Sequence, residues 1–498
     1  MKNGTAIENK NENIIEEKQI EAKAQAEADS KSDVRDAAVA PSTEEKASKP
    51  QRPERKHKVR EPLPPQSRFV YGLARFISIL VSKIAFQCKL LRNEIKGKKG
   101  PFVIIANHEA ALDFVNLIGA TTVPMTFVVS NSFYNTLPLK KAMDSIGVIP
   151  KQQFQTSLRD LAKMKRVIEE GRILVIYPAG LMCEDGRSTP IPVATYEFLK
   201  WLKTDIYMAR TSGTYFSMPK WSSGIRRGKT FMDIYKLFDK EDIAEMDIYD
   251  IKDKTDKALE FDAYREQEIL HIRYTHNDHI DGLENVLYMC PNCHSEFTMK
   301  VENHNVITCT NCGFAEKSDE YAFLHKISEE GDEIRYVSTW SKRIYNNLRR
   351  QIGKKRITEL SSKVEIQMLP KDKSKFSTVG EGELRITEDK LYLTGTNLGE
   401  ELSLALPTSN YASLPFKPGK YIEVQHGNDI FRCLPEDGRI VMKMINMIKI
   451  FYELNTAKRT IDQLTGKKKR QDKENKPEKE NKPNRAKERK RNRERRDK

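Results

Sequence analysis

Cysteine is scarce in this chain, and so are long uninterrupted apolar runs. Seven cysteines among 498 residues are too few for a disulfide framework. The amino-terminal segment is charged and lacks the apolar stretch of a secretory signal. Aromatic residues stop at Tyr452, so the end of the chain cannot stack on nucleic-acid bases. These absences indicate a cytoplasmic, reducing location, and we do not expect nucleic acid as a partner.

Charge, by contrast, is abundant and uneven. Lys and Arg exceed Asp and Glu by 15, and the segment from Lys467 to Lys498 alone accounts for ten of that excess. Residues 1–66 are rich in Glu, Lys, Ala and Pro and carry no net charge. We predict disordered tails at 1–66 and 461–498. A basic tail is compatible with anionic lipid headgroups, with nucleic-acid backbones or with simple solvation.

Residues 68–91 form the most apolar helical stretch of the chain. A spanning helix needs about 20 mostly uncharged apolar residues, and Arg75 and Lys83 interrupt this one. The pattern therefore favours a helix that lies in the headgroup region of a membrane, helped by the basic residues before it. The alternative is an amphipathic helix that packs on the core of its own domain.

Strand-like and helix-like patterns alternate after this helix, which predicts an α/β layered domain over 67–238. A helical connector is expected at 239–285. The expected elements are strands at 102–106, 125–130, 146–150, 172–177, 205–210 and 231–237, and helices at 110–120, 136–145, 155–170 and 192–202.

A histidine and an aspartate follow the first of these strands. His108 stands at the end of the apolar run Phe102–Ala106, and Asp113 comes five residues later. Such a carboxylate can fix the imidazole tautomer and stabilise the imidazolium, so that His108 acts as a general base. The segment offers no Ser or Cys nucleophile, which favours direct activation of a substrate hydroxyl. The alternative is a capped helix with a packed histidine.

Three blocks in this order resemble the glycerolipid acyltransferase family, which includes the 1-acyl-glycerol-3-phosphate acyltransferases. They are the Asn107-His108 to Asp113 segment, Ile146–Lys151, and the strand and turn Ile173–Gly180. The resemblance covers roughly residues 68–235. It implies His108 as the base and Asp113 as its orienting acid. Asn107 and Gly180 are further candidates for substrate binding, with backbone N–H groups near Gly180 as candidate donors to the oxyanion.

The resemblance fails at one position of the third block. Ala179 stands where the family has a glutamate, and the arginine that usually follows is displaced. Glu184 and Arg187 lie just downstream as possible substitutes. By resemblance, Lys151 and Arg187 are candidates for the acceptor phosphate. The alternative for both is ordinary solvated surface charge.

Four of the cysteines form two Cys-x-x-Cys pairs, which is the spacing of a structural zinc ribbon. Fifteen residues separate the pairs Cys290/Cys293 and Cys309/Cys312, and paired strands are expected between them. Four thiolates leave no open coordination position, so we predict a structural zinc site within 286–318. A clostridial-type subgroup of the acyltransferase family is similar in carrying a ribbon after its catalytic domain.

Residues 319–460 read as a β-rich domain that ends in an apolar helix. Apolar and polar residues alternate between about 363 and 435, and the helix is expected from Ile440 to Leu454. Several antiparallel strands followed by one helix resemble a pleckstrin-homology or GRAM-type domain.

Taken together, the sequence predicts an acyltransferase of phospholipid synthesis, peripheral on the inner face of the membrane. The donor would be acyl-CoA or acyl carrier protein, and the acceptor a lysophospholipid resembling lysophosphatidate. The alternative is a catalytically inactive scaffold of the same fold that binds lipid or protein.

Overall fold

The protein was analysed as a computed structural model. It describes residues 63–136, 140–153, 157–276, 279–370, 375–427 and 429–464. All of these fall within the second of two compact units, Pro62–Lys498. The predicted tail at 1–66 lies almost wholly outside the described residues, as does the basic segment from Lys467 to Lys498.

The first part of the unit, which we call the α/β region, is built on a seven-stranded sheet of order β1-β7-β6-β2-β5-β3-β4. Strands β6, β2, β5, β3 and β4 run parallel, β7 is antiparallel to β6, and β1 is parallel to β7. The strands are β1 (Lys89–Asn93), β2 (Phe102–Ala106), β3 (Met125–Ser130), β4 (Ile149–Lys151), β5 (Ile173–Ile176), β6 (Ile206–Ser212) and β7 (Phe231–Phe238).

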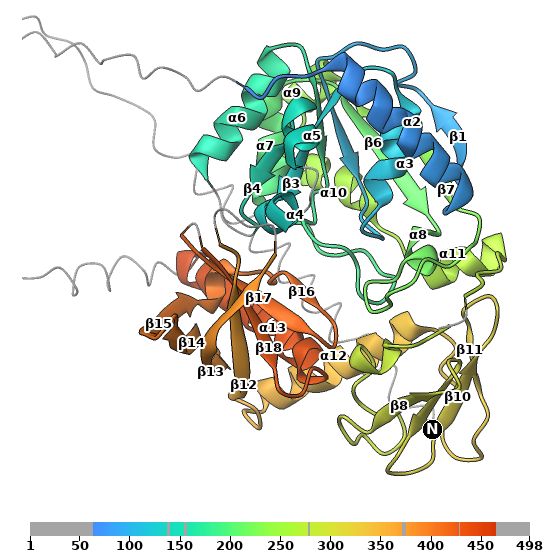
Figure 1. The fold of residues 1–498 in the computed structure, drawn as a ribbon, viewed down its shortest axis with the longest axis vertical. Coiled ribbons are helices and arrows are strands. Elements are labelled where there is room, and N and C mark those ends of the chain that lie inside the picture. Colours follow the sequence, from blue (N-terminus) through green and yellow to red (C-terminus); the bar gives the residue numbers. More distant parts are fainter. Residues whose placement is uncertain are drawn as a thin grey trace, which may run out of the picture. The chain divides into compact units, whose positions relative to one another are not determined.

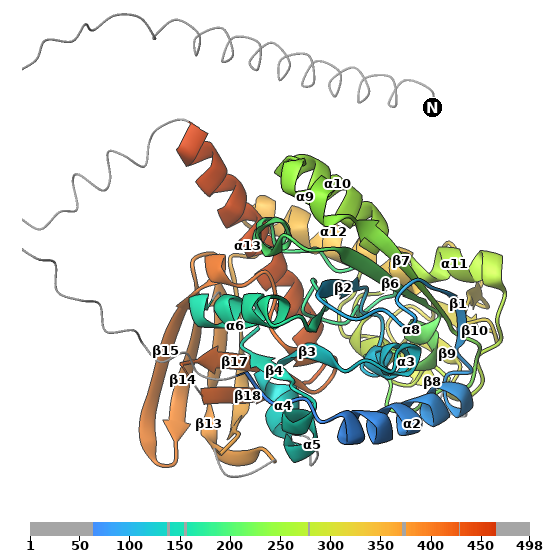
Figure 2. The ribbon, with the colours of Figure 1, turned by 90° about the horizontal axis from the view of Figure 1, so that it is seen from above.

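Helices cover both faces of this sheet (Figures 1 and 2). They are α2 (Arg68–Ile84), α3 (Asp113–Ala120), α4 (Asn131–Thr136), α5 (Lys140–Ser145), α6 (Leu158–Glu169), α7 (Ala194–Leu202), α8 (Thr214–Ser217), α9 (Lys240–Glu245) and α10 (Ile248–Leu259). Along β2, Val103 and Ile105 join a core with α6, α7, α9 and α10, whereas Phe102 and Ile104 join a core with α2, α3 and α5. This period of two buries β2 completely and confirms the layered α/β prediction.

The predicted elements of this region are largely present, with local differences. The helix expected over 68–91 ends at Ile84, and Lys89–Asn93 instead form strand β1, because Lys89 to Asn93 pair with β7 from Phe231 to Ile234. The helix expected at 155–170 begins after Ser157, whose hydroxyl accepts from Asp160 N–H. It ends before Gly171, which has a positive φ of 76°.

A smaller, four-cysteine region follows helix α11 (Ala263–Leu270). It contains the 3₁₀ turn η1 (Leu283–Asn285) and an antiparallel sheet of order β11-β10-β9-β8. The strands are β8 (Met299–Glu302), β9 (Val306–Cys309), β10 (Ala315–Ser318) and β11 (Leu324–Lys326). The expected pairing between the two cysteine pairs is present, with Met299 opposite Cys309.

The last part, the β-rich region, is an antiparallel sheet of order β15-β14-β13-β12-β18-β17-β16, and the closing helix α13 follows it. The sequence did not predict the helix α12 before β12, whose Trp340, Ile344 and Leu348 are buried. The elements are α12 (Val337–Gly353), β12 (Glu359–Met368), β13 (Ser377–Thr387), β14 (Lys390–Asn397), β15 (Glu400–Pro407), the 3₁₀ turn η2 (Thr408–Asn410), β16 (Phe416–Lys417), β17 (Tyr421–His426), β18 (Asp429–Pro435) and α13 (Ile440–Leu464).

One hydrophobic core joins the four-cysteine and β-rich regions. It also takes in Leu181 and Cys183 from the segment after β5, and Tyr215 and Phe216 from α8. The segment after β5 therefore packs against elements that lie far along the chain. Among the described residues, no helix has both the length and the apolar character needed to cross a bilayer.

Candidate active site

The strands β2 and β5 end at the same edge of the parallel part of the sheet, and the candidate site lies there. His108 follows β2, and Pro178-Ala179-Gly180 follows β5. The imidazole of His108 packs at 4.5 Å between ring centroids on Tyr177, which directly follows β5. Edges of this kind are where open α/β sheets place their ligands, because loops from several strands converge there.

His108 and Asp113 form the predicted pair. Nδ1 of His108 lies 3.1 Å from Oδ2 of Asp113. Asp113 is the first residue of α3 and only 1% exposed, and the same oxygen accepts from the backbone N–H groups of Glu109 at 2.8 Å and Ala110 at 2.9 Å. These bonds fix the carboxylate, and the carboxylate fixes the ring. The His108 side chain keeps 21% of its surface exposed, so its other nitrogen is left for chemistry.

Asn107 holds β2 against β6 within the core. Its Oδ1 accepts from Thr211 N–H at 2.8 Å, and its Nδ2 donates to the Thr211 carbonyl at 2.7 Å. Both ends of the amide are thus engaged with the backbone of the neighbouring strand. Asn107 lines the pocket, but its geometry is that of a support for the following histidine.

Glu109 is a buried acid beside the pair that sequence reasoning did not single out. Its Oε2 accepts from Thr214 Oγ1 and from Tyr215 N–H, each at 3.0 Å, and its Oε1 accepts from Asn107 Nδ2 at 3.2 Å. Burial raises the pKa of Glu109 to about 8, and the nearby carboxylates of Glu266 and Asp113 add to the increase. In the sequence, only its position directly after His108 could have indicated that Glu109 belongs to the site.

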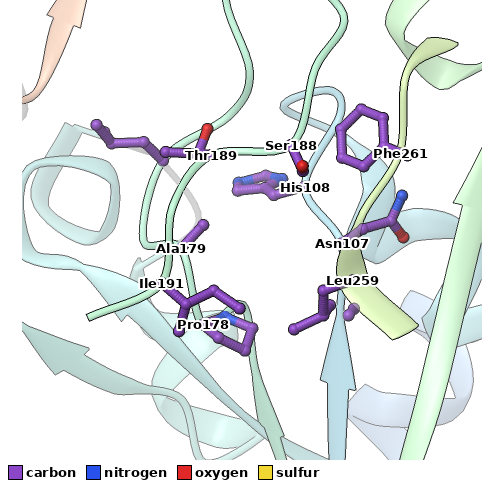
Figure 3. Close-up of a pocket in the computed structure, with 11 residues that line it drawn as sticks. Asn107, His108, Pro178, Ala179, Ser188, Thr189, Ile191, Leu259 and Phe261 are labelled. Atoms are coloured by element: carbon purple, nitrogen blue, oxygen red, sulfur yellow. The ribbon is translucent and has the colours of Figure 1, made fainter. Parts of the chain in front are cut away.

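The pocket beside His108 is narrow. Side chains from four segments enclose the imidazole, as Figure 3 shows: Asn107, Ala179, Ser188, Thr189, Ile191, Leu259 and Phe261 are among them. The space left beside the ring holds about one water molecule. A fatty acyl chain does not fit in this conformation.

The cover over His108 is the segment 181–191, and hydrogen bonds hold it in place. Cys183 N–H donates to the carbonyl of His108 at 3.1 Å. Further along, Ser188 N–H donates to the carbonyl of Phe261 at 3.0 Å, and Ala263 N–H donates to the carbonyl of Gly186 at 2.7 Å. Opening the pocket therefore requires these bonds to break.

Two predicted substrate-binding residues within this cover are bound to other parts of the protein. The guanidinium Nε of Arg187 donates to Asp185 at 3.1 Å, and Asp185 raises the pKa of Arg187 despite its burial. The carboxylate of Glu184 accepts from Lys449 of α13. Burial alone would raise the pKa of Glu184, but the nearby charges of Lys449 and Lys220 outweigh it and lower the pKa.

Besides Asn107, the remaining predicted substrate-binding residues, Gly180 and Lys151, lie at the same sheet edge. Gly180 has a positive φ of 68° and its N–H closes a turn with the carbonyl of Tyr177 at 2.9 Å. Lys151 ends β4 and is half-buried, and this burial lowers its pKa. Neither is among the residues that enclose His108.

The sulfur atoms of Cys290, Cys293, Cys309 and Cys312 lie within 4.8 Å of one another. Sγ of Cys290 is 3.7 Å from that of Cys312, and Sγ of Cys293 is 3.7 Å from that of Cys309. Four thiolates at about 2.3 Å from a tetrahedral Zn²⁺ stand about 3.8 Å apart, so this donor set fits the ion. Asn292 and Asn311 donate from their side chains to two of the sulfurs.

Comparison with known proteins bears on this site. Residues 87–218 match the family model described as Acyltransferase. The chain therefore contains an acyltransferase domain. The matched range includes His108, Asp113 and Ala179 and leaves out the four-cysteine and β-rich regions.

Among solved structures, the chain is similar to the 1-acyl-sn-glycerophosphate (LPA) acyltransferase PlsC from Thermotoga maritima. The match has 15% sequence identity and a TM-score of 0.35, and covers 41% of this chain and 80% of that one. No curated protein matches the chain.

Proposed function

We propose that this protein transfers a fatty acyl group from acyl-CoA or acyl carrier protein to the hydroxyl of a lysophosphatidate-like lipid, in phospholipid synthesis. The observation that carries the proposal is the His108–Asp113 pair at 3.1 Å, inside the range that matches the acyltransferase family. The exposed side of the imidazole faces a pocket, as a general base requires.

In this mechanism His108 removes the proton from the acceptor hydroxyl as the oxygen attacks the thioester carbonyl. The carbon–sulfur bond then breaks, an ester remains on the acceptor, and the departing thiolate takes the proton from the imidazolium. Asp113 stabilises the imidazolium between these two transfers. This mechanism has no covalent enzyme intermediate, because the acceptor hydroxyl attacks the thioester directly.

For the acceptor phosphate, Lys151 is the better supported of the two basic candidates. It shares the sheet edge with His108 and its ammonium donates to the backbone carbonyl of Gln152, whereas Arg187 is neutralised by the carboxylate of Asp185. The segment 181–191 has to move before any lipid reaches His108, and Arg187 and Asp185 both lie in it, so their ion pair can move with it. We expect Asn107 to act through its bonds to Thr211 and not by contact with substrate.

Two observations favour a second candidate function, an inactive scaffold that binds lipid or protein. Ala179 replaces the carboxylate expected after Pro178, and the pocket holds only about one water molecule. The two candidates differ in one measurement. Full-length protein is mixed with lysophosphatidate and either acyl-CoA or acylated carrier protein, and phosphatidate is quantified. Product that requires His108 supports the enzyme, and its absence with both donors supports the scaffold.

We also propose that α2 docks on the cytoplasmic face of a membrane. The helix packs on its neighbours with Tyr71 and Ser78 and turns its large apolar side chains outward. The exposed fractions are 83% for Phe69, 54% for Leu73, 67% for Phe76, 50% for Ile77, 50% for Leu80 and 57% for Ile84. An outward apolar face on a helix too short to span is typical of an interfacial anchor.

Two further proposals concern the regions that follow. We propose that the four cysteines hold a structural Zn²⁺, because their spacing and sulfur distances suit a closed tetrahedral site. The strand order of the β-rich region and its closing helix α13 support a pleckstrin-homology or GRAM-like domain. Both regions would then position the acyltransferase domain, and neither would take part in its chemistry.

A further inference from the structure

A second, larger hollow lies away from His108. It is a groove of about 550 Å³ between α2, strand β1 with the turn after it, and the carboxyl end of α3. This volume lies within the range of about 300–1,000 Å³ that is usual for small-molecule sites. None of the residues that line it encloses His108.

The charge of the groove is positive. Arg75, Arg92 and Lys96 line it, and no acidic residue of the described chain does. Arg92 is already engaged, since it donates to both oxygens of Asp233 at 2.8 Å. Arg75 is half-buried and Lys96 is exposed, and neither forms an ion pair with the described residues. An anion would satisfy both groups.

The rim of the groove is apolar. Leu90 and Leu91 are 43% and 57% exposed. They lie on the edge strand β1, next to helix α2, which has further exposed apolar residues. A bulge between Leu90 and Arg92 interrupts the pairing of β1 with β7, and two adjacent leucines both line the groove as a result. A free phosphate ion gains nothing from these side chains, whereas the upper part of a lipid does.

We propose that this groove binds the phosphate headgroup of an anionic phospholipid of the membrane. Arg75 and Lys96 would bind the phosphate, and Leu90 and Leu91 would contact the glycerol and the first part of the acyl chains. The proposal rests on the docking of α2 at a membrane and goes beyond it, since it names a specific lipid site. The groove lies at Gly119 and Ala120, at the opposite end of helix α3 from Asp113.

The test measures binding of the full-length protein to phosphatidylcholine vesicles with and without phosphatidylglycerol. The variants are Arg75→Gln with Lys96→Gln, and separately Thr122→Glu, which places an acid at an exposed position of the rim. The matched control, Arg265→Gln with Lys300→Gln, removes two cations whose side chains are 82% and 65% exposed elsewhere. The basic tails are present in every variant, so their contribution cancels. Melting curves confirm that each variant folds.

We expect the groove variants to bind phosphatidylglycerol vesicles about 10- to 30-fold more weakly, since each basic residue near an anionic surface contributes about 1 kcal/mol. The control should change binding less than about 3-fold. If the groove variants match the control, the lipid site is refuted. If the wild-type protein does not bind vesicles, both the membrane docking of α2 and the lipid site in the groove are refuted.

Acyl transfer to substrate dispersed in detergent separates this proposal from the catalytic one. There the groove variants should keep wild-type turnover while His108→Ala loses it. Groove variants that bind vesicles as well as the control does, together with turnover that requires His108, overturn the groove alone. Turnover that is absent in the wild-type protein overturns the enzyme while leaving the vesicle result to decide on the groove.

Discussion

Glu184, in the segment that covers His108, forms an ion pair with Lys449, which lies 265 residues further along the chain on helix α13. The two side chains are only 13% and 16% exposed. The charge of Lys220 also acts on this carboxylate, and burial lowers the pKa of this lysine to about 7. The β-rich region thereby contributes a charge that pairs with the cover of the candidate site.

Replacing Lys449 by Met should destabilise the protein, because Glu184 then stays buried without an ion-pair partner and with only the charges of Lys220 and Arg187 nearby. We expect the free energy of unfolding to fall by about 2 kcal/mol or more. Breaking a fully buried ion pair costs ~3–5 kcal/mol, and the cost should be smaller here because Lys220 remains. The control is Lys458→Met on the same helix α13. It breaks an exposed ion pair with Glu388 and should lower the free energy of unfolding by less than about 1 kcal/mol. Denaturant unfolding measures both.

The same variant tests whether the pair holds the cover closed. Amide hydrogen exchange in residues 181–191 should become faster in Lys449→Met than in Lys458→Met, since the cover loses its contact with α13. Equal exchange in the two variants would mean that the ion pair does not restrain this segment.

Replacing His108 by Ala should lower acyl transfer by about 10³-fold or more, within or above the ~10²–10⁴ usually supplied by a general base. The side chain is partly exposed and stacks on Tyr177, so folding and zinc content should be unchanged. His271→Ala is a suitable control, because that ring stacks on Tyr321 away from the pocket. Turnover in His108→Ala equal to the control would rule out the proposed base.

Asp113 has two tasks that different substitutions separate. Asp113→Asn keeps an oxygen for the N–H groups of Glu109 and Ala110 but loses the charge, so we expect about 10²-fold less activity with little change in melting temperature. Asp113→Ala also leaves those two buried donors unpaired and should cost about 1–3 kcal/mol each in stability. Wild-type activity in Asp113→Asn would show that the carboxylate charge is not used.

The sequence predicted the alternation of the α/β region well, because a strand such as Phe102–Ala106 is buried on both faces and reads as a continuous apolar run. It placed His108 and Asp113 together for a similar reason: both lie within one short turn between β2 and α3. The four cysteines also follow local spacing, and their sulfurs do converge.

Contacts between distant segments were beyond such reasoning. Glu184 was expected at the substrate, but its partner lies on α13, and nothing in the local pattern points there. The helix 68–91 was predicted too long because its last residues are apolar enough for a helix, yet pair with β7. In both cases tertiary contacts decided the outcome over local propensity.

Zinc should be present at one ion per chain in the purified protein. The double variant Cys293→Ser with Cys312→Ser should lose the ion and unfold at a lower temperature, because β8 and β9 pair between the cysteine pairs and Phe314 packs on Trp340 beside them. Cys183→Ser and Cys433→Ser should keep it. Metal analysis and thermal unfolding measure both effects. A zinc-free wild-type protein, or equal loss in the Cys183 variant, would contradict the assignment.

Glu109 should make stability depend on pH in an unusual direction. Its pKa is about 8 in the folded chain and near 4.5 when unfolded, because burial outweighs the hydrogen bonds from Tyr215 and Thr214. Between these values the folded chain binds a proton that the unfolded chain has released. Stability from this group is therefore complete below pH 4.5 and declines as pH rises to about 8, by on the order of 4 kcal/mol at about 1.4 kcal/mol per pKa unit.

The variant Glu109→Gln is neutral throughout this window and should remove the decline. Melting temperatures from pH 5 to pH 8 should fall less steeply in this variant than in the wild-type protein, and the exposed control Glu245→Gln should follow the wild type. Identical pH profiles for all three proteins would mean that Glu109 is ionised in the folded state. In that case Glu109 adds a second negative charge next to Asp113, and the imidazolium of His108 gains stabilisation from both carboxylates.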